Sequence, residues 1–184
     1  MKITKELLVG CLMIATVVLG GMSLINVSAQ STGMTDQQIE LIRTNCLSAK
    51  TTLNQLHVSD ALLRVNRGQL YESISTKLMN KFNNRIMNNN FDSTDFISIS
   101  KDYGSMLDTF RLDYITYEEQ LSVALDIDCS KQPVAFYDAV SSARVKRVQV
   151  HTDVVNLNQY IAQYQLILDQ FEKDYLTSIE GIKN

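Results

Sequence analysis

The chain has 184 residues, 45% of them hydrophobic and 20% charged, and its formal net charge is −3 at neutral pH. This length is sufficient for one domain with a buried core. A net acidic chain has no general basic face with which to neutralise phosphates, so we expect no nucleic-acid partner.

The first residues have the pattern of an export signal. Lys2 and Lys5 precede an almost continuous apolar run over residues 7–25. Val27 and Ala29 then fit the −3 and −1 positions of a signal-peptidase site, and we expect cleavage after Ala29. The leader carries two of the 17 basic and one of the 20 acidic residues, so cleavage leaves 15 and 19.

An uncleaved anchor is the alternative interpretation of this segment. About 19 apolar residues at about 1.5 Å each approach the roughly 30 Å of a membrane's hydrocarbon core. The positive-inside bias would then hold Lys2 and Lys5 on the cytoplasmic side. In either case we predict an extracytoplasmic location, with membrane contact only through this segment if it is retained.

Two cysteines follow the leader, Cys46 and Cys129, whereas Cys11 lies within it. An even pair in an exported chain favours a disulfide over two buried thiols.

The rest of the chain predicts long helices. Pro occurs once, at Pro133, and no alternating strand pattern is present. Thr35 and Gln38 form a capping box for a continuous or gently kinked helix over residues 36–87. Capping residues from 92 predict a second helix that ends near residues 126–128. Pro133 suits the first turn of a third helix, which extends to about residue 175.

Each predicted helix carries an apolar seam. The first runs through Ile39, Ile42, Cys46, Ala49, Leu53, Leu56, Asp60, Leu63, Arg67, Leu70, Ile74, Leu78, Phe82 and Ile86. The second runs through Phe96, Ile99, Tyr103, Leu107, Phe110, Tyr114, Tyr117, Leu121 and Leu125. The third runs through Phe136, Val140, Ala143, Arg147, Val150, Val154, Leu157, Ile161, Tyr164, Leu168, Phe171 and Tyr175. Spacings of three and four indicate coiled-coil packing.

Folding these helices back on one another sets their register. A tight turn near residues 89–91 places Cys46 opposite residues 129–134, a window that contains Cys129. The disulfide would close a loop of about 84 residues and contribute roughly 4 kcal/mol. The same register places Arg147 opposite Asp60, the charged positions of their two seams.

We therefore predict a polar layer inside the helices. Its members are Asp60, Tyr114, Tyr117 and Arg147, with Arg64, Arg67, Arg111, Asp113 and Arg144 at its edge. A charged pair in a seam typically fixes register, whereas converging Arg and Tyr side chains could instead bind a small anion. Gly68 lies inside the first predicted helix, where Gly is less favourable than most other residues. It could mark a kink, permit a close packing contact or form part of a binding surface.

No catalytic or metal-binding pattern is present. His57 and His151 have no second ligand at metal spacing, and Glu118 and Glu119 are adjacent on a helix and so do not face each other. Residues 126–130 open like a calcium loop, but the required Gly and Glu are missing. We expect no cofactor, no metal and no enzymatic activity.

Several segments resemble a family of uncharacterised exported helical proteins of Saccharibacteria-type bacteria in the candidate phyla radiation. The residues that carry the resemblance are Ser59 to Ala61, Arg64 to Gly68, Tyr71 to Glu72, Phe110 to Arg111, Asp113 to Tyr114, Tyr117, Cys129, Phe136 to Tyr137 and Ala143 to Arg144. The resemblance implies export, helices and paired cysteines, and it transfers no activity.

Taken together, the sequence predicts an all-α fold, an elongated antiparallel three-helix bundle or coiled coil (up-down-up) that one disulfide pins. The expected parts are a leader over 1–29, a linker over 30–34, the bundle over 35–176 and a frayed tail over 177–184. The leading hypothesis is a non-enzymatic protein of the cell surface or envelope that acts in structure or in binding a protein partner. The alternative is a ligand-sensing or holdase-like helical module that uses the Arg/Tyr layer.

Overall fold

The computed structural model of this chain describes residues 33–182. Its elements are α1 (Asp36–Thr44), α2 (Cys46–Ser73), the π-helical segment η1 (Ile74–Met79), α3 (Asn80–Asn88), α4 (Thr94–Asp126) and α5 (Pro133–Ile182). These described elements are all helical, so the predicted fold class is confirmed. The predicted leader over 1–29 and residues 30–32 of the predicted linker lie outside the described residues.

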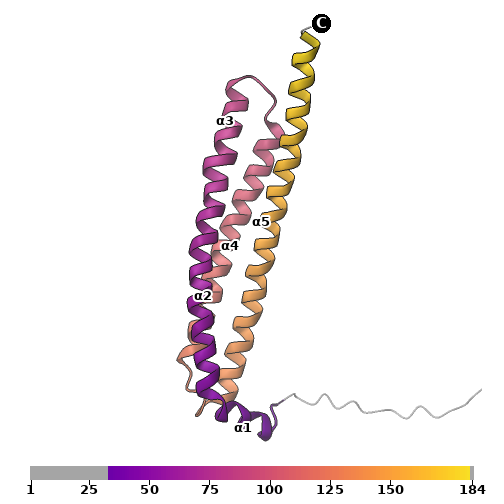
Figure 1. Cartoon of the computed structure of the whole chain (residues 1–184). Helices are drawn as coiled ribbons and strands as arrows, with labels where there is room; N and C mark the ends of the chain where they lie inside the picture. The colour runs from indigo at the N-terminus through magenta and orange to yellow at the C-terminus, as the bar shows by residue number, and fades with distance from the viewer. Residues whose placement is uncertain (1–32, 183–184) are drawn as a thin grey trace, which may run out of the picture. The chain divides into compact units, whose positions relative to one another are not determined.

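The long helices of this part of the chain lie side by side (Figure 1). The segment from α2 to α3 lies along α4, which runs back beside it, and α5 then runs along α4. α4 and α5 form the most extensively packed pair, whereas α2 meets α4 over a shorter stretch. The fully buried side chains of the core come from all three segments and include Tyr71, Tyr103, Leu121 and Leu157.

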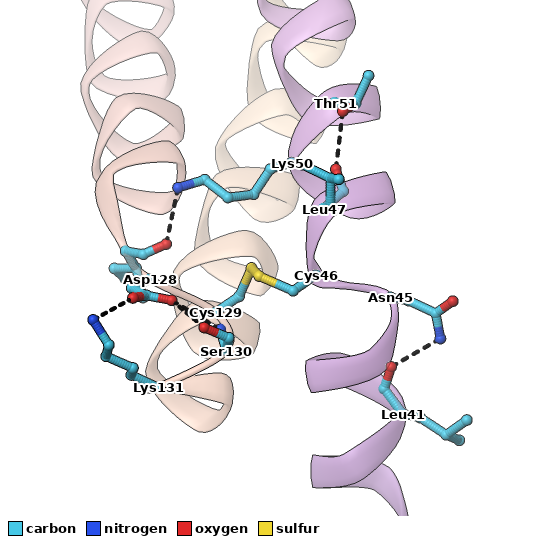
Figure 2. The surroundings of a disulfide bond; sticks show 11 residues. Leu41, Asn45, Cys46, Leu47, Lys50, Thr51, Asp128, Cys129, Ser130 and Lys131 are labelled. Carbon is cyan, nitrogen blue, oxygen red and sulfur yellow. Dashed lines mark hydrogen bonds and ion pairs between the residues drawn. A yellow bond between two sulfur atoms is a disulfide. The ribbon is translucent and has the colours of Figure 1, made fainter.

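A disulfide joins Cys46, the first residue of α2, to Cys129 in the connection between α4 and α5 (Figure 2). Their Cα atoms lie 5.5 Å apart, which is a normal disulfide spacing. Nearby, the Lys50 ammonium donates to the Ile127 carbonyl at 3.1 Å, which ties the same two segments together. The pairing predicted from helix register is thus confirmed.

The first helix is not continuous, contrary to our prediction. Asn45 leaves helical geometry, with φ −97° and ψ 9°, and separates α1 from α2. Its side-chain amide donates to the Leu41 carbonyl at 2.8 Å (Figure 2). Asn side chains compete in this way with backbone hydrogen bonds, which explains the break where the apolar periodicity gave no sign of one.

The predicted seam of the first helix is also wrong in part beyond Asp60, although Ile74 and Phe82 pack against the core and Ile86 is buried as predicted. The side chains of Leu63, Leu70 and Leu78 are exposed, and Tyr71 and Met79 are buried instead. Eight residues in a regular α-helix would place Met79 about 80° away from the face of Tyr71. The π-helical turn of η1 contains an extra residue, which returns Met79 to the same face of the helix as Tyr71. π-Bulges commonly have this effect.

The ends of the later helices follow local capping signals. Asn90 has a positive φ of 59° after α3, and the Phe91 N–H donates back to the Ile86 carbonyl at 3.1 Å. The start of α5 at Pro133 agrees with the prediction. α5 continues to Ile182, so the predicted frayed tail is helical for most of its length, and no breaker precedes Gly181.

Candidate functional site

The polar layer consists of Asp60 on α2, Tyr117 on α4 and Arg147 on α5. The Arg147 guanidinium donates to both carboxylate oxygens of Asp60, from Nε to Oδ2 at 2.8 Å and from Nη2 to Oδ1 at 3.1 Å. The Tyr117 hydroxyl donates to the same Oδ2 at 2.7 Å. These three helices are therefore joined at one carboxylate, in the register that the sequence indicated.

The three members differ in their exposure to solvent. The side chain of Asp60 is 9% exposed and that of Arg147 is 50% exposed, while Tyr117 is buried. Burial by itself raises the pKa of Asp60, but the hydrogen bonds from Arg147 and Tyr117 and the charge of Arg147 bring that pKa below its ordinary value. Asp60 is thus held as a carboxylate at neutral pH.

Tyr114 lies beside the layer but does not join its hydrogen bonds. Its hydroxyl is buried and has no hydrogen-bond partner among the described residues. Burial, followed by the nearby charge of Glu118, raises the pKa of Tyr114 to about 12. The Arg64 guanidinium lies over its ring, with the Cζ atom 4.8 Å from the ring centroid, which is a cation–π distance.

The residues predicted at the edge of the layer take separate places. Arg64 pairs with Glu118 at 3.5 Å, and Glu118 also lies 3.7 Å from His57. Arg111 turns away and forms ion pairs with Glu72 and Asp108. Within residues 33–182 no ion pair is formed by Arg67 or Arg144, and both side chains are exposed.

Asp113 meets a carboxyl group that the sequence analysis did not single out. Asp153 on α5 is 1% exposed, and its Oδ2 has no hydrogen-bond partner among the described residues, while Gln149 donates to Oδ1 at 3.1 Å. Burial first, and then the charge of Asp113, raise the pKa of Asp153. Asp153 stands between Thr152 and Val154 with no periodic signal of its own, so only its tertiary position reveals it.

A second buried polar group, Asn83, is also missing from the sequence prediction. Its amide donates to the Ser100 hydroxyl at 2.7 Å and the Phe96 carbonyl at 3.2 Å, and its oxygen accepts from the Tyr164 hydroxyl at 2.7 Å. All of its main hydrogen-bonding capacity is used inside the fold. This network therefore orders the packing of α3, α4 and α5 and offers no free group for chemistry.

A cavity of about 380 Å³ adjoins the polar layer between α2, α4 and α5. Arg64, Arg67, Arg147 and His151 contribute cationic and polar side chains to its lining, and Leu63, Phe110, Val150 and Val154 contribute apolar ones. A separate hollow on the other side of α2 is lined by Gly68 and Arg111. The structure thus places predicted layer residues around a cavity that the sequence could not show.

Other kinds of site are not formed in this part of the chain. Among residues 33–182, no group of three or more His, Cys, Asp or Glu side chains is placed to hold a metal ion. None of the described helices combines the length and hydropathy that a membrane span requires. Comparison of the chain with family models, curated proteins and solved structures finds no match.

Proposed function

We propose that this protein is a non-enzymatic, extracytoplasmic helical module that binds a helix of another protein at the cell surface or envelope. In this proposal the described helices act as an antiparallel three-helix bundle, and the outer face of α5 is the binding surface. The observation that carries the proposal is a row of exposed apolar side chains along that face.

The row, here called the α5 outer stripe, stands opposite the buried face of the same helix. Its members are Val134, Tyr137, Val145, Val148, Val155 and Leu166, each between 41% and 68% exposed. Their spacing places them on one side of a helix with 3.6 residues per turn, over about 48 Å of its length. A helix that is apolar on both faces is normally covered on both, so the stripe supports a docked partner.

The charge beside the stripe indicates the kind of partner. Arg144, Arg147 and His151 follow one edge of it, and none of the three is buried. A partner helix with an apolar seam and acidic side chains along one edge would match both features. β-Branched valines at such seam positions suit packing against a single further helix.

Export is part of this proposal and has separate support. A disulfide between Cys46 and Cys129 is typical of proteins that mature outside the reducing cytosol. The intact mass of the cell-associated protein tests it. A mass that corresponds to a chain beginning at Gln30 would show cleavage after Ala29, the full mass with surface accessibility would show a retained anchor, and a full-length protein confined to the cytosol would contradict export.

Site-specific crosslinking tests the stripe itself. A photoreactive residue at Val148 should give a discrete product with one other protein on intact cells, and Val145→Lys should remove that product. The same residue at Ser142, which is exposed on a different side of α5, is the matched control. Mapping the crosslink to an amphipathic helix with an acidic edge would support the proposal. No product, equal products at both positions, or products that contain only this chain would contradict it.

A further inference from the structure

The cavity beside the polar layer has an unequal distribution of charge. Three arginines, Arg64, Arg67 and Arg147, line it, and Asp60 is the carboxylate in its wall. Asp60 is occupied by Arg147, and Glu118 lies 3.5 Å from Arg64. Arg67 is left without an ion pair within the described residues, so the cavity carries about one uncompensated positive charge.

Apolar side chains line the same cavity. They are Leu63 on α2, Phe110 on α4, and Val150 and Val154 on α5, and the side chain of Leu63 is 52% exposed despite its size. At about 380 Å³ the space falls within the range of about 300 to 1,000 Å³ that is common for small-molecule sites. An apolar wall with a few converging polar groups is also their usual chemistry.

The Tyr114 hydroxyl provides a second, independent observation. This residue lines the cavity, is 4% exposed, and has a buried hydroxyl with no partner among the described residues. A buried hydroxyl without a hydrogen-bond partner destabilises the folded state. The polar layer does not account for it, because the Asp60 carboxylate is already held by Tyr117 and Arg147. Since the hydroxyl is itself buried, an acceptor atom of a bound ligand would reach it only after a shift of the surrounding side chains.

We propose that this cavity binds a small organic monoanion with an apolar body, such as a medium-chain or aryl carboxylate. Arg67 pairs with the anionic group, His151 and Asn158 lie within the same wall as further hydrogen-bonding groups, and Leu63 and Phe110 cover the apolar body. Arg147 stays bound to Asp60 and contributes its charge. This site shares Arg147 and His151 with the edge of the α5 outer stripe, but Arg67, which pairs with the anion, lies on α2 and is not part of the stripe.

Octanoate is the probe that tests the site, by isothermal titration and thermal shift on the disulfide-bonded protein. Arg67→Gln should weaken octanoate binding at least tenfold, because it removes the uncompensated cation. Arg85→Gln, which changes an exposed arginine on α3 that does not line the cavity, should leave binding unchanged. Both variants change exposed side chains, and their melting temperatures without probe verify that they fold.

The apolar wall has an adjacent matched control. Leu63→Ser should weaken octanoate binding several-fold, whereas Leu62→Ser should not, because Leu62 is 63% exposed and does not line the cavity. 1-Octanol has the apolar chain without the negative charge, and inorganic phosphate has the charge without the chain. Each should bind at least tenfold more weakly than octanoate. Absence of octanoate binding, or equal losses in the test and control variants, would overturn the proposal.

Discussion

The Arg147 guanidinium donates two hydrogen bonds to the Asp60 carboxylate, although the two residues are 87 positions apart in the sequence. The side chain of Asp60 is buried, whereas that of Arg147 is half exposed. If Arg147 were buried, the loss of Asp60 would leave its charge without a partner inside the fold. With half of its side chain in solvent, Arg147 can instead be hydrated when Asp60 is absent. The group that would be stranded is the Tyr117 hydroxyl, which is buried and donates to Asp60.

Asp60→Ala should therefore destabilise the protein by about 2 kcal/mol, mainly because the Tyr117 hydroxyl loses its acceptor. In a Tyr117→Phe background the same change should cost about 1 kcal/mol less, which urea unfolding of the four variants would measure as a coupling energy. Asp138→Ala, at an exposed position on α5, is the control and should stay within about 0.5 kcal/mol. Additive losses would show that the hydroxyl is satisfied elsewhere.

Removing the disulfide should lower stability by about 3 to 4 kcal/mol, because reduction restores the entropy of a long loop to the unfolded chain. The measurement is urea unfolding of the protein with Cys46 and Cys129 both changed to Ala, compared with the oxidised protein. A reducing agent should destabilise the parent protein and leave the double variant unchanged. Sensitivity of the double variant to reductant would point to a contribution from another thiol.

Asp153→Asn should stabilise the protein at pH 7 by about 1 kcal/mol, because it removes a buried carboxylate with an unpartnered oxygen beside Asp113. The pKa of Asp153 is raised in the folded state, so the unfolded chain releases this proton first as pH rises. The contribution of Asp153 to stability should therefore decline as pH rises from about 3.9 through its folded-state pKa, whereas Asp60, whose pKa is lowered, contributes in the opposite direction.

The Asn variant should lack this part of the decline when chemical unfolding is measured between pH 3 and 7. Asp138→Asn on the same helix is the matched control, since its side chain is exposed. A variant that is less stable than the parent at neutral pH would show that the Asp153 carboxylate is favourably bound.

Gly68→Ala should stabilise the protein by about 0.5 to 1 kcal/mol. A Cβ at Gly68 would meet no atom within 4 Å, and α2 is helical on both sides of it. These two observations argue against the close packing contact and the kink, whereas the third alternative, a binding surface, agrees with the hollow that Gly68 lines. For stability, the expected effect is therefore the gain in helix propensity. Thermal unfolding checks this, with Gly104→Ala as a companion, because a Cβ there also meets nothing within 4 Å. Destabilisation by Gly68→Ala would show that the position is closed in solution.

The apolar face of α4 was the easiest to predict from sequence. The following residues repeat at spacings of three and four and are all buried: Tyr103, Leu107, Phe110, Tyr114, Tyr117 and Leu121. Such a regular seam is sufficient where a helix packs against neighbours along its whole length. The first helix departs from this rule after Asp60, where Leu63 and Leu70 are exposed and Tyr71 is buried, and η1 then changes the phase again before Ile86.

The candidate site was foreseen in Asp60, Tyr117 and Arg147, which the structure joins by hydrogen bonds. Asp60 and Arg147 stood out because charge interrupts an apolar seam, and a common turn fixed which residues could meet. Asp153, Asn83 and Glu118 gave no such signal, because polar residues on a helix are ordinarily exposed.

The sequence by itself determined the helical class, the sites of the main chain reversals, the Cys46–Cys129 pairing and the Asp60–Arg147 register. Each of these depends on local periodicity, on capping residues or on the number of residues from a turn, and all three can be read from the sequence alone. Only the tertiary structure decided that Arg147 is half exposed, that Asp153 is buried next to Asp113, and that a cavity opens beside Arg67. Those outcomes depend on how closely α2 approaches α4 and α5, and that distance is set by the packing of many side chains at once.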